Sequence, residues 1–118
     1  MSRRALRLLA ALTLFASAAV AQSGFRVTHT VDRTTPTHVE ISGTVTNDTR
    51  AEALEVSVTV EALNERGKAA ARGIAFVSGR LPAGETAKFT AKVPVVAGVN
   101  GYRASVTSFR FVQSIQGP

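Results

Sequence analysis

The chain has two histidines, His29 and His38, which are its best candidate metal ligands. They could approach each other across neighbouring strands, but a zinc site needs three or four protein ligands. Cysteine is absent and the only methionine is Met1, so thiolate chemistry and methionine-rich copper sites are excluded. We therefore predict that the protein binds no metal.

A pair of carboxylates is the next arrangement that could do chemistry. Glu55 and Glu61 are six residues apart on one side of an extended segment, which separates them by about 20 Å at the rise of a strand. Catalytic carboxylate pairs in glycosidases are only about 5 to 9.5 Å apart. The serines form no G-x-S-x-G elbow, and no glycine-rich phosphate loop is present. The sequence therefore predicts no catalytic residue, no cofactor and no enzymatic activity.

The elements that would position these side chains are β-strands, and the clearest is the segment 54–62, LEVSVTVEA. Every second residue is apolar, with Val58 in the middle of the apolar set. The residues between them, which we expect to face water, are Glu55, Ser57, Thr59 and Glu61. Strict two-residue periodicity predicts a strand with one face in a core and the other in water.

Other parts of the chain have a similar pattern. The further predicted strands are 25–32, 39–47, 68–77, 86–93 and 102–112. We expect the first of these at a sheet edge, and Phe89 inside the core. Gly43 within a strand indicates a bulge or the close approach of another backbone. The apolar positions of the last strand change sides near 107–108, which predicts a bulge there.

Turn residues separate these strands. Segment 64–67, NERG, is predicted to be a four-residue hairpin turn, with Gly67 at a positive φ angle. Segment 81–84, LPAG, suits a type I turn that ends at Gly84.

Tyr102 opens the last strand, where sandwich domains often place a tyrosine whose hydroxyl bonds back to the backbone. Six or seven short strands with no helical period predict an all-β fold, an antiparallel β-sandwich.

The N-terminal segment differs from the rest of the chain. Three arginines, Arg3, Arg4 and Arg7, precede an apolar run that ends in the small residues of segment 19–21, AVA. This order is typical of a secretory signal peptide, and the run is short for a membrane span. We predict cleavage after Ala21, which leaves a domain at 22–118 with its core at about 25–113. An uncleaved anchor is the alternative, and Sec or twin-arginine export are both compatible with the sequence.

The charge of the domain follows from this cleavage. Of 14 lysines and arginines, the three in the signal peptide are lost, so 11 remain against 8 acidic residues, a net charge of +3. The remaining charges are scattered with both signs and form no basic stripe, so we expect no nucleic-acid partner. We also expect no stable membrane insertion once the signal peptide has been removed, and a periplasmic or secreted location.

Three segments, ISGTVTN at 41–47, VEALN at 60–64 and LPAGE at 81–85, together resemble the FxLYD domain family of bacterial extracytoplasmic proteins. Segment 41–47, ISGTVTN, is similar to the family's I-x-G-x-V-x-N strand. Segment 60–64, VEALN, occupies the place of the F-x-L-Y-D segment, although none of those letters is matched. Segment 81–85, LPAGE, with Phe89 beyond it, resembles the family's L-x-P-G-E turn with the proline displaced by one position. The resemblance covers roughly 25–112 and implies an exported immunoglobulin-like sandwich without catalytic residues.

A cluster of valines in the predicted loop 95–101 is the sequence's candidate binding surface. Val95, Val96 and Val99 either plug the open end of the sandwich or contact a partner. The leading hypothesis is a non-enzymatic module that binds another protein through this loop or through an edge strand. The alternative is a structural, envelope-associated domain without a discrete ligand site.

Overall fold

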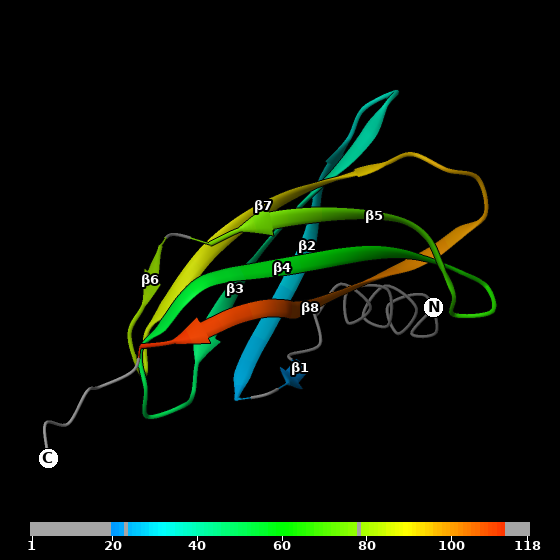
Figure 1. Ribbon diagram of the computed structural model, residues 1–118. Helices are drawn as coiled ribbons and strands as arrows, with labels where there is room; N and C mark the ends of the chain where they lie inside the picture. The colour runs from blue at the N-terminus through cyan, green and yellow to red at the C-terminus, as the bar shows by residue number, and fades with distance from the viewer. Residues whose placement is uncertain (1–19, 23, 78, 113–118) are drawn as a thin grey trace, which may run out of the picture.

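The computed structural model describes residues 20–22, 24–77 and 79–112, and all regular structure in them is β-strand (Figure 1). The strands are β1 (Val20–Gln22), β2 (Phe25–Thr34), β3 (His38–Asn47), β4 (Ala53–Asn64), β5 (Ala69–Phe76), β6 (Arg80–Leu81), β7 (Thr86–Pro94) and β8 (Val99–Phe111). The six long strands correspond to the six predicted ones. The predicted signal peptide lies outside the described residues except for Val20 and Ala21, which belong to β1.

The strands form two antiparallel sheets. One sheet has the order β1-β2-β3-β7. In the other, β4 lies in the centre, with β8 on one side and β5 followed by the short β6 on the other, because Ala53 pairs with both Leu81 of β6 and Phe111 of β8. β5 lies against β7 and β8 lies against β2, so the two sheets form two layers. The predicted antiparallel β-sandwich is therefore confirmed.

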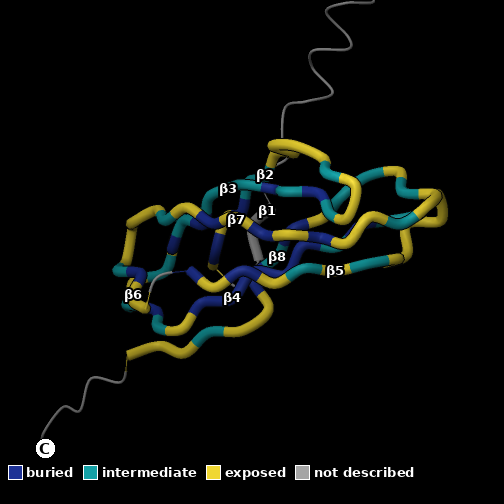
Figure 2. Tube along the Cα trace, turned by 90° about the horizontal axis from the view of Figure 1, so that it is seen from above, coloured by how far each residue is buried: buried dark blue, intermediate teal, exposed yellow. Residues whose placement is uncertain are grey.

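The core lies between the two layers, where Figure 2 shows the buried positions of the strands facing one another. In β4, Val58 is fully buried together with its neighbours at alternate positions, as predicted. In β7, Phe89 is 4% exposed and belongs to the same core. The fully buried side chains of β2 and β3 are Phe25, Val27, Ile41, Val45 and Asn47.

The alternation of β4 breaks at its beginning, where the predicted pattern was wrong. Ala53 is fully buried, whereas Leu54, which was expected inside, is partly exposed. The cause is Glu55, whose φ angle is 54°. The pairing of β4 with β8 shifts register between Leu54 and Ser57, so an extra residue on β4 turns the alternation over.

The outer face of β4 is also less exposed to solvent than predicted. Ser57 is 7% exposed and Thr59 is 9% exposed, although both were expected to face water. β4 has a neighbouring strand on each side, β5 and β8. Thr59 and Thr107 of β8 are hydrogen bonded through their hydroxyls, at 2.8 Å between the oxygens. Polarity alone therefore did not identify the face that water reaches.

The bulge predicted near 107–108 is present in β8. Val106 pairs with Val58, but Ser108 pairs with Ser57, so Thr107 is the extra residue. Beyond this bulge the inward side of β8 changes. Phe109 then meets Phe25 of the other sheet edge to face, with 4.9 Å between the ring centroids.

The glycines fulfil their predicted roles. Gly67 and Gly84 have φ angles of 75° and 80° in their turns. At Gly43, a Cβ atom would lie 1.8 Å from the carbonyl oxygen of Thr28 and 2.7 Å from the ring of Phe89. The close approach of another backbone therefore requires glycine at this position of β3.

Candidate functional site

The two histidines occupy separate environments. His29 lies on the inner side of β2, where burial lowers its pKa and a hydrogen bond to the backbone of Tyr102 partly opposes this. His38 is held near the hairpin end of β3 by Thr37, at 3.0 Å, and by Glu40, at 3.4 Å. Within the described part of the chain, no three His, Cys, Asp or Glu side chains lie close enough together to hold a metal ion.

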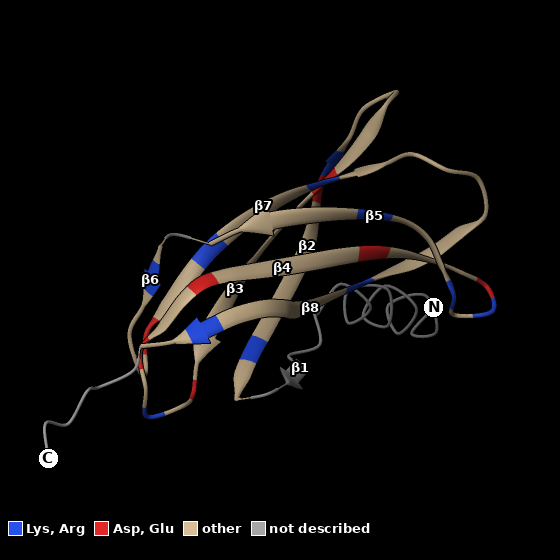
Figure 3. Ribbon diagram, in the orientation of Figure 1, with Lys and Arg blue, Asp and Glu red and all other residues tan. Residues whose placement is uncertain are grey.

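The carboxylates of the sheets take part in ion pairs with arginines. Glu61 lies between two arginines, with Arg103 at 2.6 Å and Arg72 at 3.4 Å. The hydrogen bond from Arg103 is the main reason that the pKa of Glu61 is lowered, and Arg110 lowers the pKa of Glu55 in the same way. A general acid needs a raised pKa, so these carboxylates are suited to surface ion pairing. Figure 3 shows both signs of charge spread over the sheets.

The predicted valine cluster is divided by the structure. Val99 is the first residue of β8 and packs against the core. Val96 is partly buried, and Val95 is 45% exposed. The three side chains therefore differ in burial and do not form one exposed apolar surface.

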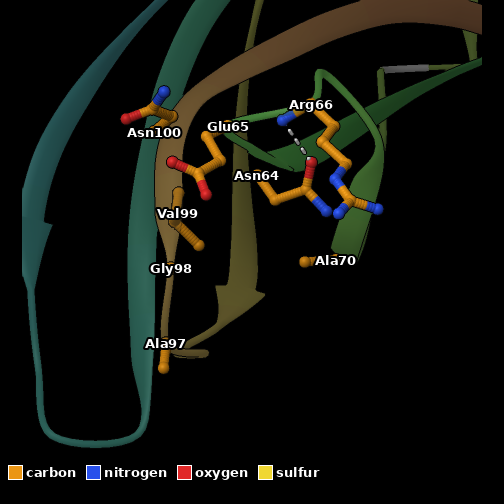
Figure 4. A pocket seen from close by; sticks show the side chains of 8 residues that line it. All are labelled: Asn64, Glu65, Arg66, Ala70, Ala97, Gly98, Val99 and Asn100. Carbon is orange, nitrogen blue, oxygen red and sulfur yellow. Dashed lines mark hydrogen bonds between the residues drawn. The ribbon is translucent and has the colours of Figure 1, made fainter.

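A hollow lies at this end of the molecule, between the β4–β5 hairpin and the residues that lead into β8 (Figure 4). The Asn64 side chain is engaged in the turn, because its oxygen accepts hydrogen bonds from the backbone N–H groups of Arg66 and Lys68. The hollow also contains Glu65 and small residues of the β7–β8 loop. This arrangement has no acid, base or nucleophile in a shared hydrogen-bond network.

Tyr102 is half-buried beside the core, and burial raises the pKa of its hydroxyl. The expected hydrogen bond from this hydroxyl to the backbone does not occur among the described residues. The backbone of Tyr102 lies close enough to the His29 side chain to oppose the lowering of the histidine pKa. Tyr102 therefore contributes to the contact between β8 and β2.

On one side of the molecule the edge strands β5 and β7 of the two sheets lie close together. At Gly73 of β5, a Cβ atom would lie only 2.1 Å from the carbonyl oxygen of Lys92 in β7. The two backbones therefore nearly touch. A further strand has no room between β5 and β7 at this point.

On the opposite side of the molecule, part of the β2 edge has no strand paired with it in the described part of the chain. β1 pairs with β2 only at Phe25, Arg26 and Val27, and no described strand pairs with the same side of segment 28–34. In Figure 1 the hairpin of β2 and β3 extends beyond the other strands. The register of β2 against β3 shifts between Val31 and Arg33, so the regular part of the open edge ends there.

The hydrogen bonds of β2 show which backbone groups face this edge. The Asp48 N–H donates to the carbonyl of Gly24, at 2.8 Å, so Gly24 and alternate residues after it bond towards β3. The N–H and C=O groups of Val27, His29 and Val31 therefore point to the open side. Val31 is also 50% exposed. This edge is the candidate site, and the valine loop that we favoured from the sequence does not provide an equivalent one.

Among the described residues, no helix is long and apolar enough to cross a membrane. Comparisons with protein-family models, curated proteins and solved structures found no match to this chain. The resemblance to the FxLYD family stays a prediction.

Proposed function

We propose that the protein is a non-enzymatic binding module that accepts an extended polypeptide strand at the open edge of β2. The observation that supports this most strongly is the pairing of β2. Its edge already holds a strand, β1, over three residues, and the rest of the edge has no strand beside it in the described part of the chain.

The physical basis of such binding is the unpaired backbone. N–H and C=O groups at a sheet edge form a template for another strand, and strand addition is a common mode of peptide recognition. Natural edges are often protected by charges and bulges. In β2 both protections, Asp32 and Arg33 beside the register shift, occur near the hairpin end. Segment 28–31 is left as the part of the edge that has neither a strand beside it nor one of these protections.

The expected location of this activity is the periplasm or the outside of the cell. The signal-peptide pattern of 1–21 supports export, and the segments that resemble the FxLYD family support an exported immunoglobulin-like module. The alternative function is that of a structural envelope domain, which would need no partner strand at the edge of β2.

Photo-crosslinking in cells tests this proposal. Thr30 is exposed on β2, and a photoreactive amino acid in its place would lie beside any added strand. We expect crosslinking to a polypeptide, whether another protein or another copy of this chain. The control is the same substitution at Lys92, which is exposed on the closed side of β7. No product at Thr30, or equal products at both positions, would contradict the proposal and favour the structural alternative.

A further inference from the structure

The sequence of the open edge is symmetric about His29. Segment 26–32 is RVTHTVD, so threonines and then valines stand at equal distances on either side of the histidine. The outermost pair, Arg26 and Asp32, has opposite charges. An antiparallel pair of identical strands is symmetric in the same way, because residues before the centre of one strand face residues after the centre of the other.

From this we infer that the strand bound at the β2 edge is β2 of a second copy of the chain. The two strands pair antiparallel about a two-fold axis at His29. This inference rests on the proposed function and specifies its partner. It joins the β2-β3-β7 sheets of the two copies into one continuous sheet across the dimer.

The contacts of this register are complementary on both faces. Val27 of one copy faces Val31 of the second copy, which covers a side chain that is 50% exposed in the single chain. Thr28 faces Thr30 of the second copy on the outer face. Arg26 faces Asp32 of the second copy, and the symmetric contact repeats each of these pairs. Opposite charges and β-branched pairs both stabilise cross-strand pairing.

The backbone selects the same register. Paired residues must both direct their N–H and C=O groups to the open side, and Val27, His29 and Val31 do so. Centres at Thr28 or Thr30 also satisfy this condition. However, a centre at Thr28 places Arg26 opposite Thr30, and a centre at Thr30 places Arg26 opposite Thr34. Among these three centres, only His29 joins the two charges.

The charged side chains are accessible for this exchange. Arg26 is bonded to Asp48 at 2.5 Å, but its side chain remains 53% exposed. Asp32 is exposed and accepts a hydrogen bond from Ser42. Surface ion pairs are weak, so Arg26 can also contact the second copy at little cost.

β1 and the second copy exclude each other. Val20 pairs with Val27, the position that Val31 of the second copy occupies in the dimer. Cleavage after Ala21, as the sequence predicts, removes Val20 and Ala21 and frees the edge from Arg26 onward. The processed chain is therefore the form that dimerises.

Charge-exchange variants of the protein that begins at Gln22 test this inference. Arg26→Asp places two acidic side chains opposite each other at both ends of the pairing, and Asp32→Arg places two basic ones there. Each variant alone should dimerise about tenfold or more weakly than the unmutated chain in sedimentation velocity. A mixture of the two variants should recover dimerisation, because Asp at position 26 of one then faces Arg at position 32 of the other. This recovery cannot occur if the single variants are merely misfolded.

Three results would overturn the inference. The first is that the unmutated protein stays monomeric at concentrations up to about 1 mM. The others are that the single variants dimerise as well as the unmutated chain, or that the mixture of the two variants stays monomeric. If the purified protein is monomeric while Thr30 crosslinks to a different protein, the dimer is wrong and the proposed function stands. If Thr30 gives no crosslink of any kind, both are wrong.

Discussion

At the scale of single residues, position within the sheet decides how much water a side chain meets. Thr59 and Thr90 both alternate with core residues in the sequence, and this alternation predicts that both side chains face outward. Thr90 lies on β7 and is exposed, whereas Thr59 lies on the central strand β4 and is 9% exposed. Two-residue periodicity assigns a side chain to a face of a sheet, but the neighbours that cover this face come from distant parts of the chain.

This difference predicts the cost of a new charge. Val58→Asp buries an unpaired carboxylate in the core and should lower the free energy of unfolding by several kcal/mol. Thr59→Asp places a charged carboxylate at a position that is only 9% exposed, beside the Thr107 hydroxyl that can donate to it, and should cost roughly 1–3 kcal/mol. Thr90→Asp is the control, at less than about 0.5 kcal/mol. Urea denaturation measures all three. If Thr59→Asp is as harmless as Thr90→Asp, the outer face of β4 is open to water.

The lowered pKa of His29 predicts a pH dependence. Its folded-state pKa lies below the ordinary value of 6.5, mainly because burial disfavours the charged form. The unfolded chain therefore binds the proton more readily, and stability falls as the pH drops through 6.5 towards the folded-state value. The free energy of unfolding should decrease in this range, and His29→Gln should remove the decrease. An unchanged slope in the variant would show that another group is responsible.

At the scale of elements, the local pattern predicts strands well and their irregularities unevenly. The bulge at Thr107 could be predicted because the apolar positions change sides there. The bulge at Glu55 could not, because the alternation of segment 54–62 is unbroken in the sequence. Likewise, the symmetry about His29 and an edge position of segment 25–32 are predictable from the sequence, but only the strand pairing shows which part of that edge is open.

The contact between β2 and β3 predicts a large effect of one methyl group. Gly43→Ala places a Cβ atom 1.8 Å from the Thr28 carbonyl oxygen, so the strands must move apart. The variant should lose about 2 kcal/mol or more of unfolding free energy. Gly101→Ala in β8 is the matched control, because no atom lies within 4 Å of its Cβ position. Thermal melting of both variants compares them, and equal melting temperatures would contradict the close approach.

At the scale of the whole molecule, the N-terminus and the binding edge are linked. The predicted cleavage site lies inside β1, which pairs with Phe25–Val27. The signal-peptide pattern and the edge position of β2 were both predictable from the sequence, but their overlap was not. It depends on which strand the segment 20–22 pairs with, and no local pattern contains that information.

This link predicts how processing changes the backbone of β2. Mass spectrometry of the exported protein should find a chain that begins at Gln22. In this chain the Val27 N–H has lost its partner on β1, so it should exchange with deuterium faster than in a longer chain that retains Val20 and Ala21. The comparison uses the Asp32→Arg variant, so that dimerisation does not protect the same amide. The Val45 N–H, inside the sheet on β3, is the internal control and should exchange equally slowly in both chains. Equal exchange at Val27 in the two chains would mean that β1 does not cover the edge, and processing would then have no effect on strand addition at β2.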